Sequence, residues 1–216
     1  MTDTNEPPRG RPRSEPKRQA IIDATLALIE SRGFTGLSVD RIAEQAGVGK
    51  ATVYRWWPTK AAVTLDAALT IATPATSHPK TGSAREDLAR HLRYIIRLFR
   101  GARTGPIIAA VLGEIQHDPE LAAEYQRRVQ APRRAAAKQI LEDGIARGEL
   151  RADLDRDDVL DLIYGPIYYR LLITHKPMSA RYADTVLDRI WPTITAEPTT
   201  RTPRNTKSGQ LSEKDL

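Results

Sequence analysis

The 216-residue chain has no cysteine, and only 6% of its residues are aromatic. Without cysteine there are no disulfide bonds, no thiolate catalysis and no cysteine-ligated metal, which fits a reducing cytoplasm. No apolar stretch approaches the roughly 20 residues that a membrane-spanning helix needs. The N-terminus is polar and lacks the apolar segment of a signal peptide. We therefore expect a cytoplasmic protein with no membrane partner.

Clustered catalytic and metal-binding groups are also lacking. The four histidines are scattered without the spacing of metal ligands, and no nucleophile–base–acid triad is recognisable. Residues 47–52 resemble a phosphate-binding loop, but the first glycine is missing and Ala51 occupies the position where Ser or Thr would hold magnesium. We expect no metal site, no cofactor and no enzymatic activity.

Alanine, leucine, isoleucine and arginine are common, which favours helices. Apolar residues recur at helical spacing between glycine and proline breaks and predict an all-α fold of about nine helices. The expected helices are 15–32, 39–46, 49–57, 60–72, 84–100, 106–115, 119–147, 157–174 and 180–194. We expect a three-helix domain at 15–62, a larger helical domain at 63–195, and disordered ends at 1–14 and 196–216.

The most informative pattern lies in residues 37–60. Ser38 can cap a helix that begins at Val39, and Gly47 follows that helix where the backbone needs a left-handed conformation. A second short helix then turns Val53 inward and leaves polar and aromatic side chains outside. A helix-turn-helix presents its second helix to DNA in this way. Glycine-linked helix pairs also occur in proteins that bind no nucleic acid, so the turn alone leaves both interpretations open.

Residues 15 to about 65 resemble the DNA-binding domain of TetR/AcrR-family transcriptional regulators. An aromatic pair and Lys60 contribute to the resemblance, together with these segments: Arg32-Gly33-Phe34, Leu37-Ser38-Val39, Ile42-Ala43, Ala46-Gly47-Val48 and Thr52-Val53-Tyr54. The sequence departs from the family at Trp56-Trp57-Pro58, where many members have a smaller aromatic pair, and at Gly49, where a polar helix cap is common. Residues 161–170 also look like a C-terminal class found among these regulators.

The outward positions of the second short helix are the candidate DNA contacts. We expect three side chains to reach base edges: Lys50, Thr52 and Arg55. Ala51 shares that surface. Four further residues are expected to hold phosphates and fix the register: Ser38, Tyr54, Trp56 and Lys60.

The net charge of the chain is +6, and basic residues gather just before the first helix. Arg11 and Arg13 lie in an arm whose glycine and prolines favour an extended backbone. The arm is expected to enter a minor groove or lie along phosphates. An ordinary solvated tail is the alternative interpretation.

The resemblance implies that the C-terminal domain dimerises and binds a small-molecule effector. Helices 157–174 and 180–194 are the candidates for dimerisation because they combine many apolar residues: Leu160, Ile163, Ile167, Leu171, Leu172, Val186, Leu187 and Ile190. Apolar walls with a few hydroxyls are typical of ligand sites, and the candidate pocket residues are Ile95, Phe99, Leu112, Ile115, Tyr125, Tyr164 and Tyr168. In both cases the alternative is that these residues fill the core of one subunit.

We therefore predict a dimeric, sequence-specific regulator that binds a palindromic operator in double-stranded DNA. We expect a repressor whose DNA affinity falls when an apolar or amphipathic effector binds. The helix at 60–72 would transmit that signal by changing the separation of two reading heads. A small-molecule-binding helical protein without operator control remains the alternative, and an enzyme on a helical bundle is disfavoured by the lack of clustered groups.

Overall fold

The computed structural model describes residues 14–71 and 80–196, so most of the two ends that the sequence predicts to be disordered lie outside the described residues. The helices are α1 (Glu15–Arg32), α2 (Val39–Gln45), α3 (Lys50–Trp56), α4 (Lys60–Ile71), α5 (Ala84–Arg100), α6 (Thr104–Glu114), α7 (Pro119–Tyr125), α8 (Ala131–Ala146), α9 (Arg156–Tyr169) and α10 (Ala180–Ile194). A π-helical turn, η1 (Gln126–Gln130), joins α7 to α8, and a second, η2 (Arg170–Thr174), extends α9. With α7–η1–α8 counted as one helix, the described residues form nine helices, which confirms the predicted all-α fold.

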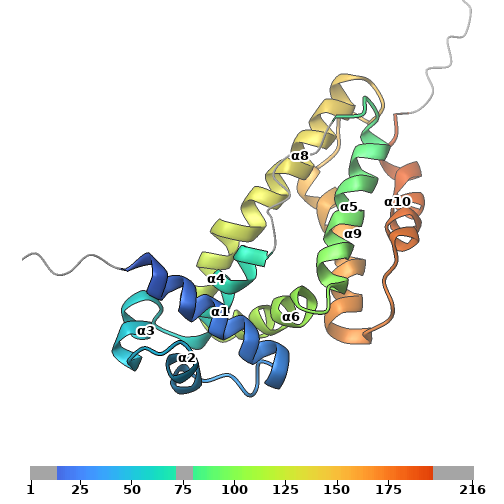
Figure 1. Cartoon of the computed structure of the whole chain (residues 1–216). Coiled ribbons are helices and arrows are strands. Elements are labelled where there is room, and N and C mark those ends of the chain that lie inside the picture. Colours follow the sequence, from blue (N-terminus) through green and yellow to red (C-terminus); the bar gives the residue numbers. More distant parts are fainter. Residues whose placement is uncertain (1–13, 72–79, 197–216) are drawn as a thin grey trace, which may run out of the picture.

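The helices form two parts, shown in Figure 1. We call α1–α3 the reading head and α5–α10 the body. The helix α4 lies between them, packed against α1 on one side and α6 on the other. Val63 and Ala67 of α4 belong to the hydrophobic core of the head, whereas Ala61 and Leu65 belong to the core of the body. The boundary expected at residue 62 therefore falls inside a helix that both cores share.

Side-chain caps fix several helix ends. Asp118 accepts a hydrogen bond from the Leu121 amide at the start of α7, and Asp155 accepts from two amides at the start of α9. These caps satisfy amides that have no partner within the first helical turn. Each cap depends only on residues a few positions apart in the sequence.

Three details differ from the sequence expectation. The helix α6 begins at Thr104, two residues before Pro106, and the Thr104 hydroxyl donates to the Leu98 carbonyl near the end of α5. Gly105 is required there, since a Cβ would collide with the Phe99 carbonyl oxygen. The two π-helical turns were not foreseen. Each lies close to an internal proline, Pro132 or Pro166, whose missing N–H interrupts the regular ladder.

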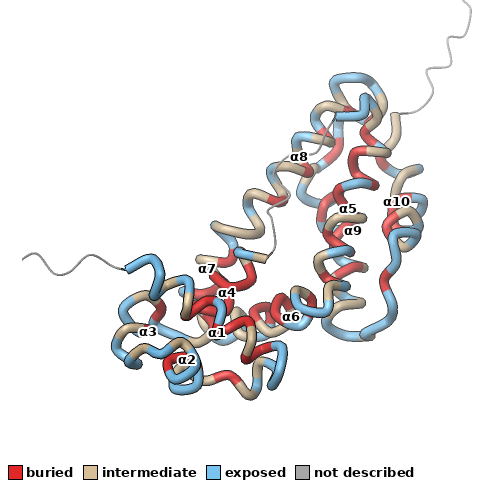
Figure 2. Tube along the Cα trace, in the orientation of Figure 1, coloured by how far each residue is buried: buried red, intermediate tan, exposed pale blue. Residues whose placement is uncertain are grey.

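Buried residues are most frequent in α4 and α5 and also line the inner sides of α1, α6 and α9 (Figure 2). The head exposes most of its outer surface, including much of α2 and α3. Within the described ranges, no helix combines the length and apolar character needed to cross a membrane.

Candidate nucleic-acid interface

The turn between α2 and α3 has the geometry that the sequence predicts. Ser38 caps α2 by accepting a hydrogen bond from the Arg41 amide over 3.3 Å. Gly47 has a φ of +63°, a left-handed conformation that residues with a Cβ rarely adopt. The Val48 amide then donates to the Ala43 carbonyl over 2.9 Å and closes the end of α2. The turn therefore fixes the orientation of α3 relative to α2.

The inner face of α3 is anchored in the head. Val53 is fully buried beside Ile42 and Ala43 of α2. Val48 of the turn is half-buried against the same core, as expected for an apolar plug. Because these contacts hold one face of α3 inward, the opposite face is left for a partner.

The outer face of α3 carries most of the predicted DNA contacts. Lys50, Ala51 and Arg55 are exposed, Thr52 is half-buried, and 54% of Tyr54 is exposed. A tyrosine offers a partner both an apolar ring and a polar hydroxyl, and tyrosines are enriched at interfaces. These side chains form one continuous patch on one helix.

Lys50 forms an ion pair with Asp40 of α2. Both side chains are more than half exposed, and ion pairs of this kind contribute little to stability. Asp40 therefore holds the Lys50 ammonium beside α2 through a weak ion pair that can be broken at small energetic cost.

Lys60 opens α4 beside the reading helix. Its Nζ lies 4.5 Å from the centre of the Phe34 ring, a cation–π contact that positions the ammonium. Thr59 caps the helix by accepting from the Ala62 amide over 3.1 Å. The positive end of the α4 dipole and the Lys60 charge therefore coincide, an arrangement that attracts phosphate.

The two tryptophans have different environments. Trp56 is half-buried and lies with its ring 5.9 Å from the Arg18 guanidinium. Trp57 is buried in the head, and its indole N–H donates to Asp66 over 2.9 Å. The aromatic pair thus supplies one side chain near the surface and one that anchors α3 to α4.

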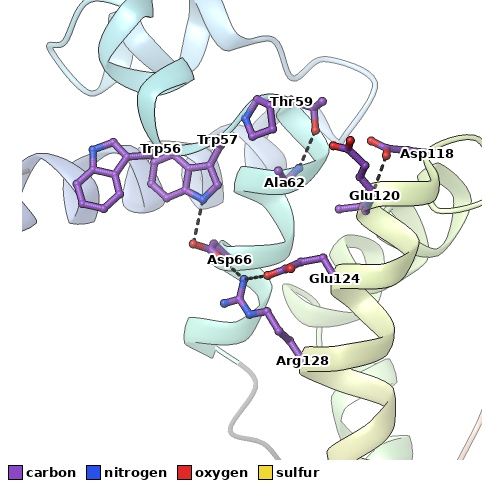
Figure 3. Close-up of a pocket in the computed structure, with 11 residues that line it drawn as sticks. Trp56, Trp57, Thr59, Ala62, Asp66, Asp118, Glu120, Glu124 and Arg128 are labelled. Atoms are coloured by element: carbon purple, nitrogen blue, oxygen red, sulfur yellow. Dashed lines mark hydrogen bonds and ion pairs between the residues drawn. The ribbon is translucent and has the colours of Figure 1, made fainter.

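Asp66 joins the head to the body (Figure 3). Its carboxylate accepts hydrogen bonds from Trp57, from Arg18 of α1 over 2.8 Å and from Arg128 of η1 over 2.5 Å. Burial alone would raise the pKa of Asp66, but the three donors outweigh burial and hold the pKa below its ordinary value. We call these four residues the Asp66 junction. Sequence reasoning missed it, although an aspartate within the apolar helix α4 was a usable signal.

A cleft of about 300 Å³ lies beside the junction, between the start of α4 and α7. Figure 3 shows Trp56 and Thr59 on one side and Asp118, Glu120 and Glu124 on the other. Two of these carboxylates have structural roles, since Asp118 caps α7 and Glu124 pairs with Arg128 over 3.1 Å. The cleft lies between head and body on this side, whereas elsewhere the two parts are joined by the Asp66 junction, by Ile107 of α6 in the core of the head and by an ion pair between Arg103 and Glu30 of α1.

The seven candidate pocket residues share the core of the body. Five are buried and two, Ile115 and Tyr168, are half-buried against them. Tyr125 borders a small cavity that is also lined by Arg133, a residue that was not among the candidates named from the sequence. His91 is buried, with its Nε2 2.6 Å from the Tyr164 hydroxyl.

Arg11 and Arg13 of the predicted basic arm lie outside the described residues, so their role stays a prediction.

The tight turn, the buried inner face of α3 and its exposed, polar outer face have the geometry of a helix-turn-helix DNA-binding protein. Comparison with known proteins agrees. Residues 21–67 match the model of the bacterial regulatory proteins of the tetR family, and residues 78–190 match that of the Tetracyclin repressor-like C-terminal domain. The chain therefore belongs to the TetR family, as its resemblance indicated, and it is a DNA-binding transcriptional regulator.

Individual relatives support the same assignment. The chain is 47% identical over 174 residues to the HTH-type transcriptional regulator YdeS of Bacillus subtilis, covering 81% of this chain and 87% of that protein. It is 26% identical over 164 residues to the DNA-binding transcriptional repressor TetR of Mycobacteroides abscessus, covering 74% of this chain and 85% of that protein. The crystal structure of the TetR family regulator SCO0332 has a TM-score of 0.66 at 30% identity and covers 82% of this chain and 98% of that one.

Proposed function

We propose that the protein is a homodimeric repressor that binds a palindromic operator through α3 and releases it when an amphipathic small molecule binds in the body. The observation that carries this proposal is the outer face of α3, where Tyr54 and Arg55 are exposed while Val53 is buried. The relative named as a repressor favours repression over activation. Such a regulator acts on cytoplasmic DNA and has no enzymatic activity.

The residue roles follow from position. Lys50, Thr52 and Arg55 reach base edges, and Ala51 contacts the DNA surface between them. The residues that hold phosphates are Ser38, Tyr54, Trp56 and Lys60. Contacts to base edges determine the preferred DNA sequence, whereas contacts to phosphates determine affinity and register. Arg11 and Arg13 extend the basic surface before α1.

The dimer uses an apolar face of α9 and η2. Of the eight dimer candidates named from the sequence, five are buried inside the subunit: Leu160, Ile163, Ile167, Val186 and Leu187. The large apolar side chains that remain exposed in this region are Leu162, Tyr169, Leu172 and Ile173. We call these four residues the α9 outer face. A second copy would cover them, and the two-fold axis would place two reading heads one helical turn of DNA apart.

The helix α4 provides the coupling. It belongs to both cores, and its Asp66 is bonded to α1 and to η1. An effector that moves α4 relative to η1 therefore also moves the head. Coupling of this kind is commonly about 1–3 kcal/mol, roughly 5- to 150-fold in affinity.

Fluorescence anisotropy with the DNA upstream of the chain's own gene tests the proposal. A reader that makes about 6–10 phosphate contacts should lose about 10³–10⁵ in affinity between 50 and 200 mM salt. Lys60→Ala should weaken binding to all sequences equally and lower the salt slope by about 1. Arg55→Ala should change the preferred base at one position, by about 1–3 kcal/mol, in a selection from random duplexes.

Two results would contradict these roles. If Arg55→Ala weakened binding to all DNA sequences equally, Arg55 would be a phosphate contact. If the full chain bound small molecules but no DNA at 50 mM salt, it would be a small-molecule-binding protein without operator control.

A further inference from the structure

A small cavity lies between α4, α6 and the α7–η1–α8 helix. Its lining residues are Leu65, Ala68, Leu69, Ile108, Val111, Tyr125, Val129 and Arg133. Its volume of about 30 Å³ is enough for two water molecules or one small polar group. Six of the lining residues are aliphatic, and Tyr125 and Arg133 are the two lining residues whose side chains carry polar groups.

Arg133 is a buried cation. Only 9% of the residue is exposed, and its Nη1 donates to the Tyr168 hydroxyl over 3.0 Å. Among the described residues, no carboxylate forms an ion pair with it, whereas the adjacent Arg134 pairs with Asp157 and Asp161. A guanidinium has five N–H donors, and a buried charge without a counter-ion is costly. The structure therefore buries a positive charge that an anion would neutralise.

Tyr125 supplies a second donor at the same cavity. The residue is 4% exposed, and its hydroxyl lies near the Tyr168 hydroxyl and the Arg133 guanidinium without the geometry of a full hydrogen bond to either. Burial raises the pKa of Tyr125 well above its ordinary value, so the hydroxyl keeps its proton. A buried hydroxyl without a partner is uncommon in a folded protein, and here it borders the same space as Arg133.

We propose that this cavity binds the carboxylate of an amphipathic organic acid, with Arg133 and Tyr125 donating to its oxygen atoms. The apolar part of the acid lies among Leu65, Leu69 and Val111. This inference rests on the proposed function, because it names the chemical class of the effector.

The position of the cavity explains how such a ligand would act. The cavity of about 30 Å³ has room for the carboxylate alone. The apolar part of the acid can therefore enter only if α4 and η1 move apart. Leu65 precedes Asp66 on α4, and Val129 follows Arg128 on η1. A ligand that pushes Leu65 and Val129 apart therefore strains the hydrogen bond between Asp66 and Arg128 and shifts α4, and with it the head, relative to the body.

Isothermal titration calorimetry of the full chain with octanoate, 1-octanol and octylammonium tests the charge preference. Octanoate should bind about tenfold or more tightly than 1-octanol, the lower range for hydrogen bonds to a charged group. Octylammonium should bind more weakly than either. Arg133→Met, which keeps the volume but removes the charge, should remove the octanoate preference, and Arg133→Lys should retain part of it.

Arg127→Met is the matched control, because Arg127 lies in η1, pairs with Glu124 and is 71% exposed at its side chain. It should leave the preference unchanged. Circular dichroism melting of each variant verifies folding. Equal binding of octanoate and 1-octanol, no binding of any of the three compounds, or a preference that survives in Arg133→Met would overturn the proposal.

A separate DNA titration without ligand distinguishes this inference from the proposed function. An octanoate preference that depends on Arg133, in a chain that binds no DNA, would support the site and contradict the repressor.

Discussion

Asp66 is the residue that links the head and the body by polar contacts at the centre of α4. Its partners Arg18 and Arg128 lie 48 and 62 positions away in the sequence, on helices that meet only in the folded chain. Hydrogen bonds from charged donors to a buried carboxylate are among the stronger polar interactions in proteins. The junction therefore stabilises the fold and also orients the head.

Asp66→Asn should lower the free energy of unfolding by about 2 kcal/mol at pH 7, within the range for hydrogen bonds to charged groups. The pKa of Asp66 is lower in the folded chain than the value of about 3.9 expected when unfolded. The contribution of the carboxylate is therefore fully present above about pH 4 and is lost as the pH falls through the folded pKa. Urea unfolding at pH 7 and in acid measures the difference between the two proteins, which should shrink in acid.

Asp153→Asn is the control, because Asp153 is exposed and pairs with Arg151 two positions away. It should change stability little. A difference between Asp66→Asn and the unchanged chain that stayed constant from pH 7 into acid would contradict the role of the charge.

Local and non-local features of the site differed in how well the sequence predicted them. The Ser38 cap, the left-handed Gly47 and the inward Val53 were predicted because each depends on neighbours within a few positions. The partners of Trp57 and the burial of Arg133 were not, because they depend on how separate helices pack.

At the scale of elements, α9 shows what helical periodicity can and cannot predict. The sequence identified it as apolar and as a candidate for dimerisation. Periodicity alone did not show which side faces α8 and α10 and which side, at Leu162 and Ile173, remains exposed. Five of the eight named residues proved to be buried inside the subunit.

The double variant Leu162→Glu/Ile173→Glu should convert a dimer into a monomer, because it would place two pairs of like charges in an apolar interface. Sedimentation velocity measures the change. Ala102→Glu is the control, since Ala102 is an exposed residue between α5 and α6, and it should leave the dimer intact. A double variant that sediments as the unchanged dimer would show that the interface lies elsewhere.

At the scale of the whole molecule, the predicted all-α fold with an N-terminal reader was confirmed. The candidate pocket was taken from apolar stripes, and the structure places those seven residues in or against one core. A cavity forms where several helices pack together without filling the space between them. The pattern of apolar residues in any one helix does not predict where this happens. Of the seven candidates, Tyr125 borders the cavity that contains Arg133, and the other six stay predictions.

Hydroxyl-radical footprinting of the full chain on the DNA upstream of its own gene tests the central claim most directly. A dimer that reads through two copies of α3 should protect two patches on one face of the duplex, with centres about 10 base pairs apart or a multiple of that spacing. The protection should disappear in Leu162→Glu/Ile173→Glu at the same protein concentration. No protection at 50 mM salt, or an identical footprint from the monomeric variant, would contradict the account.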